Sequence, residues 1–249
     1  MKPVRGTISI VSHGHGPLIR QLLGDLAGQA GIENWLVLVT LNIPEPFEDI
    51  AGLRLRVIRN DAPKGFGANH NAAAALAEGA LFVIVNPDIR LPGHETLRRI
   101  AELDWGGKPA LRAPVVVAPD GAREDSVRAN LSPPNLVRRA AGRASGWEVD
   151  PDGPGFFWLA GMFLIAPLDR FRALGGFDER FRLYCEDYDL CARWRIADGR
   201  IELIRDLCVV HDARRDSRRS LRHLRWHLAS LLRVWASAPF WRVMARRHD

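Results

Sequence analysis

The sequence predicts an α/β fold in which a mostly parallel sheet is flanked by helices. Short runs of β-branched and aliphatic residues recur through the first 90 residues, and helix-like segments separate them. This alternation is typical of βαβ units with right-handed crossovers. The chain has 249 residues, of which 47% are hydrophobic and 26% charged, so it can build a sizeable core as one large domain or two small ones.

Four strands are predicted in the first half, at residues 7–12, 35–41, 55–60 and 81–85. The second and fourth of these are apolar throughout, as expected of strands that are covered on both faces. Residues 17–30 carry leucines at helical spacing and residues 66–79 are rich in alanine, so both segments predict helices. Ligands of such sheets bind beyond the carboxyl ends of the strands.

The second half of the chain is less regular. Residues 104–156 are rich in glycine and proline and contain one apolar run at 110–118. We expect loops and a short helix from 130 to 155. The other predicted elements are an apolar segment at 156–167, helices at 168–174 and 185–198, and a last strand at 201–211.

The basic charge of the chain is concentrated in its C-terminal tail. The formal net charge is +6, and 32 of the 35 basic residues are arginine. Residues 213–249 contain ten arginines and two acids, which leaves residues 1–212 slightly acidic. We therefore predict a domain over 1–212, with halves 1–90 and 91–212, and a basic tail over 213–249. No nucleic-acid partner is expected, because the domain carries no motif for one.

The tail predicts an amphipathic helix over residues 217–236. One face carries Leu221, Leu224, Leu228, Leu231 and Trp235. The arginines lie mainly off this face. Two interpretations stay open: the leucines pack on the domain, or they contact an anionic membrane surface, with Trp226, Trp235 and Trp241 as interfacial anchors.

Cysteine content and hydropathy suggest a cellular location. Three cysteines are too few and too irregularly spaced for a disulfide framework or a zinc site. No apolar run approaches the roughly 18–20 residues that span a bilayer, and the first residues lack the core of a signal peptide. We expect a cytoplasmic location, peripheral on the inner face of a bacterial membrane if the tail binds lipid.

Asn86-Pro87-Asp88 directly follows the predicted strand at 81–85. The proline ends the strand, so Asp88 is held at its carboxyl end, where a carboxylate can bind Mg²⁺ or Mn²⁺. An ordinary turn capped by an Asp is the alternative. His211 follows the last strand and would be a second metal ligand if it lies near Asp88, although a lone histidine is more often structural.

Carboxylates gather between residues 175 and 190. Gly175-Gly176-Phe177-Asp178-Glu179 is followed by Glu186-Asp187-Tyr188-Asp189, where a helix begins. Acids at a helix start are favoured by the helix dipole, so capping explains part of the pattern. A carboxylate that faces a cleft from this position would serve as a general base.

Residues 60–71 form a glycine-bearing loop that leads from a strand into a helix. Backbone N–H groups at such a helix start, together with Lys64, can receive a phosphate. The loop matches neither the Walker motif nor the dinucleotide fingerprint.

In this order and spacing, these segments resemble the family-2 glycosyltransferases of GT-A fold, on the bacterial rhamnosyltransferase-like branch. The resemblance runs from Ile8 to about Ser217 and is most specific from Trp158 through the 176–179 turn to Leu190. The Asn-Pro-Asp triplet is the form that this branch commonly gives to the Asp-x-Asp motif of the family. The fold implied is a Rossmann-like nucleotide-binding half followed by an acceptor half.

The resemblance also implies roles for individual residues. Asp187 corresponds to the catalytic base, with Glu186 beside it, and Asp88 and His211 correspond to ligands of a divalent metal, Mg²⁺ or Mn²⁺. The donor-binding positions are Val11, Ser12, His13, Asn42, Asn60, Lys64, Gly65, Asn71, Asn86 and Gly161.

The function implied is inverting, metal-dependent transfer of a sugar from a nucleotide-diphosphate donor to a hydroxyl of a cell-surface polysaccharide precursor. Rhamnose is the sugar that the branch suggests, and the acceptor would be a glycan or a lipid-linked glycan. Two alternatives are a nucleotidyltransferase, whose activation loop residues 12–16 match poorly, and a non-catalytic protein that binds a nucleotide sugar.

Overall fold

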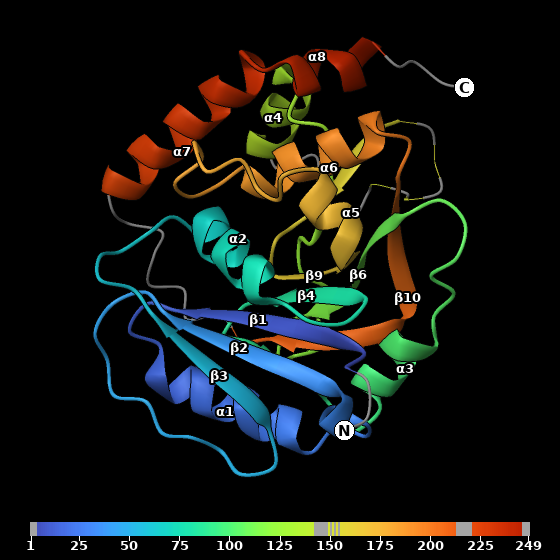
Figure 1. Ribbon diagram of the computed structural model, residues 1–249. Helices are drawn as coiled ribbons and strands as arrows, with labels where there is room; N and C mark the ends of the chain where they lie inside the picture. The colour runs from blue at the N-terminus through green and yellow to red at the C-terminus, as the bar shows by residue number, and fades with distance from the viewer. Residues whose placement is uncertain are drawn as a thin grey trace.

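The computed structural model describes residues 4–141, 149, 151, 153, 155–212 and 221–245. An eight-stranded sheet, in the order β3-β2-β1-β4-β9-β6-β10-β5, forms its centre, and β7 and β8 form a separate pair. Helices cover both faces of the large sheet (Figure 1). The predicted α/β class is therefore confirmed.

The strands are β1 (Gly6–Ser12), β2 (Trp35–Leu41), β3 (Arg54–Arg59), β4 (Leu81–Val85), β5 (Ile89–Arg90), β6 (Ala110–Val117), β7 (Val127–Ala129), β8 (Phe157–Leu159), β9 (Phe163–Pro167) and β10 (Arg200–His211). The α-helices are α1 (Gly16–Ala27), α2 (Phe66–Leu76), α3 (Thr96–Glu102), α4 (Pro133–Ala140), α5 (Leu168–Ala173), α6 (Glu186–Ile196), α7 (Leu221–Trp235) and α8 (Ala238–Ala245). A 3₁₀ turn at Ile32–Asn34 precedes β2.

The first half is a parallel βαβ unit, as the alternating pattern predicts. β1 lies between β2 and β4, β3 pairs with the outer edge of β2, and all three pairings are parallel. Ser12 pairs with Leu41 at the carboxyl ends of β1 and β2. Because parallel strands end at the same edge, the polar residues that follow β1, β2, β3 and β4 are brought to one side of the molecule.

Two hydrophobic cores lie on opposite faces of the sheet. Alternate residues of one strand point to different cores: Leu36 and Leu38 pack with the helices α2, α5 and α6, whereas Val37 and Val39 pack with α1 and α3. Figure 1 shows the same division, with α1 on one side of β1 to β3 and α2 on the other. Strands buried on both faces explain the continuous apolar runs of the sequence.

The second half contains the elements that the sequence does not reveal. The apolar segment 156–167 is not continuous: a turn at 160–162 divides it into β8, in the small sheet, and β9, antiparallel between β4 and β6. The short elements β5, β7 and α3 have no clear local signature. Part of the 130–155 segment is α4, and most of the rest lies outside the described residues.

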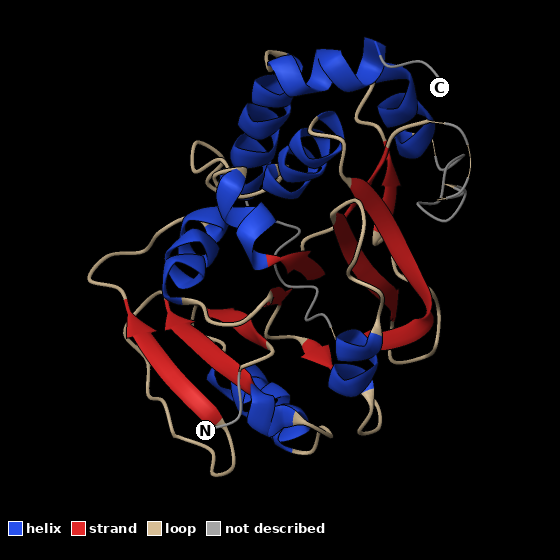
Figure 2. Ribbon diagram, turned by 45° about the vertical axis from the view of Figure 1, so that its right-hand side comes forward, coloured by secondary structure: helices blue, strands red, loops and turns tan. Residues whose placement is uncertain are grey.

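The tail packs on the domain through two helices. α8 lies against α6, and Figure 1 and Figure 2 show α7 and α8 running along the end of the molecule that carries α4 and α6. Val234, Phe240 and Val243 are buried there, and the Trp235 indole N–H donates to the Leu131 carbonyl at 2.9 Å. Residues 217–220 of the predicted tail helix lie outside the described residues.

Candidate active site

The carboxylates of the 186–189 segment stand at the first turn of α6, as predicted. The chain enters this helix through Tyr184 and Cys185, which have left-handed φ values of 73° and 64°. Residues other than glycine rarely adopt this backbone conformation, and it recurs at functional sites, where it orients a side chain.

Asp187 is held by the backbone of two segments. Its Oδ2 accepts a hydrogen bond from the Gly161 N–H at 2.9 Å, and its Oδ1 accepts one from the Tyr188 N–H at 2.9 Å. Burial raises the pKa of Asp187, while the Arg128 guanidinium and the backbone hydrogen bonds oppose that rise. Burial thus makes Asp187 a more basic carboxylate, which suits proton abstraction.

Glu186 is the more deeply buried of the two neighbours, with 5% of its surface exposed. Its Oε2 has no hydrogen-bond partner among the described residues. Burial, and then the nearby Asp187, raise the pKa of Glu186 well above its usual range. A carboxyl group in this position is stable as the neutral acid.

Asp88 and His211 meet where β4 and β10 end. The His211 Nε2 lies 3.2 Å from the Asp88 Oδ2, and the Asp212 N–H donates to the Asp88 carbonyl at 2.8 Å. Glu124 adds a second carboxylate, 3.6 Å from the His211 Nδ1. Burial opposes protonation of His211, but both carboxylates outweigh it and raise its pKa. The predicted approach of Asp88 and His211 is therefore confirmed.

This corner fits a divalent metal in its donor chemistry. The Asp88 Oδ1 is buried and has no hydrogen-bond partner in the described part of the chain, and the buried His211 Nδ1 has only the Glu124 carboxylate near it, at 3.6 Å. Carboxylate oxygen with imidazole nitrogen is a donor pair that suits Mn²⁺. Among the described residues, no group of three or more His, Cys, Asp or Glu side chains is arranged to hold a metal ion.

Backbone hydrogen bonds connect the segment before Asp88 to the segment that binds Asp187. The antiparallel pairing of β4 with β9 places Asn86 against the turn at 160–162, and the Asn86 N–H donates to the Met162 carbonyl at 2.9 Å. The N–H of the preceding residue, Gly161, donates to Asp187. A side chain at Gly161 would approach the Phe66 ring to 3.4 Å, so this backbone passes closely between the two groups.

The residues predicted to hold the nucleotide form a hydrogen-bond network at the carboxyl ends of β1, β2 and β3. The Asn42 Oδ1 accepts from the Asn60 Nδ2 at 2.9 Å and from the Lys64 N–H at 2.8 Å. The Asn42 Nδ2 lies 3.2 Å from the His13 Nδ1 and donates to the Lys64 carbonyl at 3.0 Å. Asn69 closes the network by accepting from Asn60 at 2.7 Å.

Other residues that are predicted to bind the sugar donor lie where backbone segments meet. Ser12 is buried at the end of β1, where its carbonyl accepts from the Asn42 N–H at 2.8 Å, and Val11 precedes it in the same strand. Gly65 approaches the Arg182 backbone so closely that a Cβ would lie 2.8 Å from its carbonyl oxygen. The loops that lead into α2 and α6 therefore touch each other.

Asn71 joins α2 to the glycine turn before α6. Its Oδ1 accepts from the Phe177 N–H at 2.8 Å, and its Nδ2 donates to the Phe177 carbonyl at 2.9 Å and to Glu179 at 3.0 Å. Gly176 must be glycine here, because a Cβ would lie 2.2 Å from the Asn71 Oδ1. The amide of Asn71 is thus engaged within the protein.

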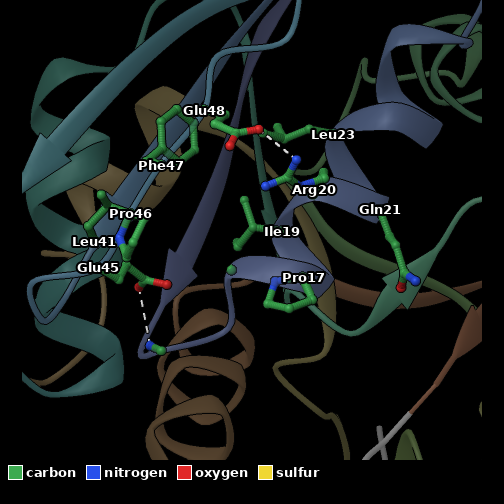
Figure 3. Close-up of a pocket in the computed structure, with 12 residues that line it drawn as sticks. Pro17, Ile19, Arg20, Gln21, Leu23, Leu41, Glu45, Pro46, Phe47 and Glu48 are labelled. Carbon is green, nitrogen blue, oxygen red and sulfur yellow. Dashed lines mark hydrogen bonds and ion pairs between the residues drawn. The ribbon is translucent and has the colours of Figure 1, made fainter.

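A separate cavity of about 530 Å³ lies between α1 and the loop after β2 (Figure 3). Its polar side chains pair with groups around it: Glu45 accepts from the Gly14 N–H at 3.1 Å, and Arg20 contacts Glu48 at 2.6 Å. The residues that line it include none of the predicted site residues.

Comparisons with known proteins identify the fold and a set of relatives. No protein-family profile matches the chain. The rhamnosyltransferase WbbL of Escherichia coli is 27% identical over 97% of this chain and 95% of its own length. An N-acetylglucosaminyl-diphospho-decaprenol L-rhamnosyltransferase of Mycobacterium tuberculosis is 30% identical over 43% of this chain and 39% of its own length.

Solved structures of similar shape are glycosyltransferases. The mannosyltransferase PcManGT of Pyrobaculum calidifontis, in complex with GDP-Man and Mn²⁺, superposes with a TM-score of 0.63 at 18% identity, over 94% of this chain and 67% of that one. S. aureus TarS 1–349 with UDP-GlcNAc gives 0.59 at 16% identity, over 85% and 59%. The chain therefore has the GT-A fold of these enzymes.

Three residues of the candidate site are missed by sequence reasoning. Arg128 stands near Asp187, Glu124 near His211, and Asn69 within the Asn42 network. Arg128 and Glu124 come from the irregular 104–156 stretch. The pairing of β7 with β8 places Arg128, and a backbone hydrogen bond from the Glu124 N–H to the Val116 carbonyl places Glu124. Asn69 lies inside the quoted 60–71 loop, where its place one helical turn after Gly65 is the available signal.

Proposed function

We propose that this protein is a glycosyltransferase that moves a sugar, with L-rhamnose as the first candidate, from a nucleotide-diphosphate donor to a hydroxyl of a lipid-linked glycan. The observation that carries the proposal is the continuous arrangement in which the Gly161–Met162 backbone joins Asp187 to the Asp88–His211 corner. WbbL and the mycobacterial relative, both named as rhamnosyltransferases, support the sugar, and the mycobacterial name supports a lipid-diphosphate acceptor.

In the proposed reaction, the acceptor oxygen attacks the anomeric carbon of the donor in line with the departing diphosphate. Asp187 takes the hydroxyl proton as the new carbon–oxygen bond forms, and the electron pair of the broken bond leaves with the nucleoside diphosphate. One carboxylate base and direct displacement invert the anomeric centre, in contrast to a double displacement by a carboxylate nucleophile.

A divalent ion held by Asp88 and His211 would neutralise charge on the departing diphosphate. We include this ion in the proposal because the Asp88 Oδ1 is buried without a hydrogen-bond partner within the described residues and the His211 imidazole lies beside it. PcManGT and GalNAc-T7, both solved with Mn²⁺, share the fold. On this proposal, Asn42, Asn60 and Lys64 hold the nucleotide at the strand ends.

A thermal-shift screen of nucleotide sugars with and without Mn²⁺ tests the proposal. A ligand at about 100 times its Kd stabilises the native state by about 2.7 kcal/mol, so the true donor should raise the melting temperature measurably. We expect dTDP-rhamnose to give the largest shift, and only with Mn²⁺ present. Absence of a shift with every nucleotide sugar would contradict donor binding.

We further propose that the outer face of the tail contacts an anionic membrane surface. Leu224, Leu228 and Leu232 follow one another along α7 and are 53%, 52% and 63% exposed, and Trp241 of α8 is 60% exposed. Arginines at 225, 233 and 242 are exposed on the same helices. Apolar side chains flanked by arginine suit the headgroup region of anionic lipid. No helix in the described part of the chain is long and apolar enough to cross a membrane.

Sedimentation with lipid vesicles tests this contact. The wild type should sediment with anionic vesicles and not with zwitterionic ones, and the triple change of Leu224, Leu228 and Leu232 to serine should abolish binding. Leu76→Ser, at a leucine of α2 that is 45% exposed, is the matched control and should leave binding intact. Equal sedimentation of the triple variant and the wild type would contradict the proposal.

A further inference from the structure

The two adjacent carboxyl groups of α6 lie in different environments. Asp187 accepts two backbone hydrogen bonds of 2.9 Å, and hydrogen bonds to a carboxylate favour its ionised form. Glu186 is more deeply buried, and its Oε2 meets no donor among the described residues. A buried charge without a partner is costly, whereas a neutral carboxylic acid is not.

Arg128 supplies the positive charge of this region. It stands opposite Trp158 in the β7–β8 pair, and its guanidinium carbon lies 4.9 Å from the centroid of the Trp158 ring. Asp125 fixes the Arg128 Nε, through its carbonyl at 2.9 Å and its Oδ2 at 3.2 Å. Arg128 is therefore held between an ion pair with Asp125 and the Trp158 ring.

The same small sheet connects Arg128 to the base. The Ala160 N–H donates to the Ser126 carbonyl at 2.8 Å, and the residue after Ala160 is Gly161, which binds Asp187. Arg128 lowers the pKa of Asp187 and of Cys185, so its field reaches the start of α6. It is absent from the groups that influence Glu186.

The geometry points to one negative charge shared by Glu186 and Asp187, which resides on Asp187 because Arg128 and two backbone amides hold it there. Arg128 is then a positioning residue for the base, and Glu186 is its neutral neighbour. This inference rests on the proposed function, in which Asp187 takes the acceptor proton.

The remaining titratable groups around Asp187 do not change this assignment. Burial raises the pKa of the Cys185 and Cys191 thiols, so both stay neutral. Burial also raises the pKa of both carboxyls, but the amides and Arg128 offset the rise only for Asp187. A negative charge on Glu186 in addition to that on the adjacent Asp187 would be opposed by desolvation and by repulsion between the two carboxylates.

Infrared difference spectroscopy on the resting protein tests where the charge resides, and it requires no turnover. The difference between wild type and Glu186→Gln at neutral pH should show loss of the C=O stretch of a neutral carboxylic acid. The difference for Asp187→Asn should show loss of the carboxylate stretches. The reverse pattern, or carboxylate loss in both variants, would overturn the assignment even if the enzyme proved to act on another substrate.

The role of Arg128 is tested by following the Asp187 carboxylate signal against pH in Arg128→Met and Arg128→Lys. The methionine variant should raise the midpoint by about 1 pH unit, and lysine, which keeps the charge, should restore most of it. The acidic limb of kcat/KM should move in the same direction. Arg112→Met is the matched control, because Arg112 also stacks on a tryptophan, 4.4 Å from the Trp105 centroid, and pairs with Glu202. An unmoved midpoint in Arg128→Met, or an equal movement in the control, would overturn the inference.

Discussion

The strand ends of the first half and the start of α6 differ in how their polar groups are satisfied. At the strand ends, the side-chain oxygen of Asn42 accepts two hydrogen bonds and its amide donates to Lys64, so neutral groups satisfy one another. At the start of α6, Glu186 keeps a buried oxygen without a partner, and the chain enters through two left-handed residues.

The difference separates recognition from chemistry. A paired neutral network fixes the shape of a binding surface and is insensitive to pH. Buried carboxyl groups with shifted pKa values are costly to stability, and they recur where a proton must be moved. We therefore expect substitutions at the start of α6 to lower the rate of the reaction, and substitutions in the Asn42 network to weaken donor binding and stability.

Replacing the base should have the largest effect. Asp187→Asn should lower kcat by about 10²–10⁴-fold, because proton abstraction is lost while the shape is kept. Donor affinity by calorimetry should change little. Asp169→Asn, at an exposed acid in the first turn of α5, is the control. Near-normal turnover of Asp187→Asn would rule out this residue as the base.

Removing the Asp88 carboxylate should weaken donor binding at least about tenfold in the presence of Mn²⁺. Mutating residues that only hydrogen-bond to metal ligands already lowers metal affinity or activity by about that factor. Asp88→Asn keeps the size of the side chain but removes its charge. The measurement is donor Kd with and without Mn²⁺, and the exposed Asp206→Asn is the control. If Mn²⁺ still tightened donor binding in Asp88→Asn as in the wild type, the metal corner would lie elsewhere.

Breaking the neutral network should reduce stability. Asn42→Ala leaves the Lys64 N–H without its acceptor and removes one of the two acceptors of the Asn60 amide, which should cost about 1–3 kcal/mol of unfolding free energy. Urea unfolding measures this, with Asn34→Ala as a control outside the network. KM for the donor should rise more than kcat falls. A loss confined to kcat would show that the network takes part in the chemistry.

The smallest effect concerns His70, which lies between the two regions. It packs against Phe66 at 4.5 Å and Phe177 at 6.1 Å between ring centroids, and its Nδ1 lies 2.8 Å from the Ser9 hydroxyl. Burial lowers the pKa of His70 to about 3. As pH falls below the value of an unfolded histidine, the unfolded chain binds a proton that the native state does not, so stability decreases.

Between about pH 7 and 5.5, the wild type should lose about 1 kcal/mol more unfolding free energy than His70→Gln, which cannot titrate. Urea unfolding at both pH values gives the difference, and all other titrating groups are common to the two proteins. Identical pH dependence in the two would mean that His70 is not held neutral by burial.

Local pattern was sufficient for much of the fold. The strands at 35–41 and 81–85 have the bounds that their apolar runs predict, and Asn86-Pro87 ends β4 as a proline should. The contact of Asp88 with His211 follows from the same logic, because both residues stand at strand ends in one sheet. The catalytic and ligand roles assigned by resemblance stay predictions.

What the sequence does not disclose depends on distant pairing. Arg128 reaches the base only because the three-residue β7 pairs with β8, about 30 residues later, and so short a strand has no local signature. Asn71, which the resemblance assigns to donor binding, also joins α2 to Phe177, and this contact depends on how α2 packs. In the tail, Leu224 and Leu228 share the predicted face with Leu231 and Trp235, but only the latter two turn partly inward.

The most direct test of the account is the anomeric configuration of the product. The enzyme would be incubated with dTDP-L-rhamnose, Mn²⁺ and a lipid-diphosphate-linked N-acetylglucosamine, and the new linkage would be assigned by NMR. One base and direct displacement predict a product whose anomeric centre is inverted relative to the donor. Retention of configuration would require a second displacement and would contradict the role of Asp187 as the base.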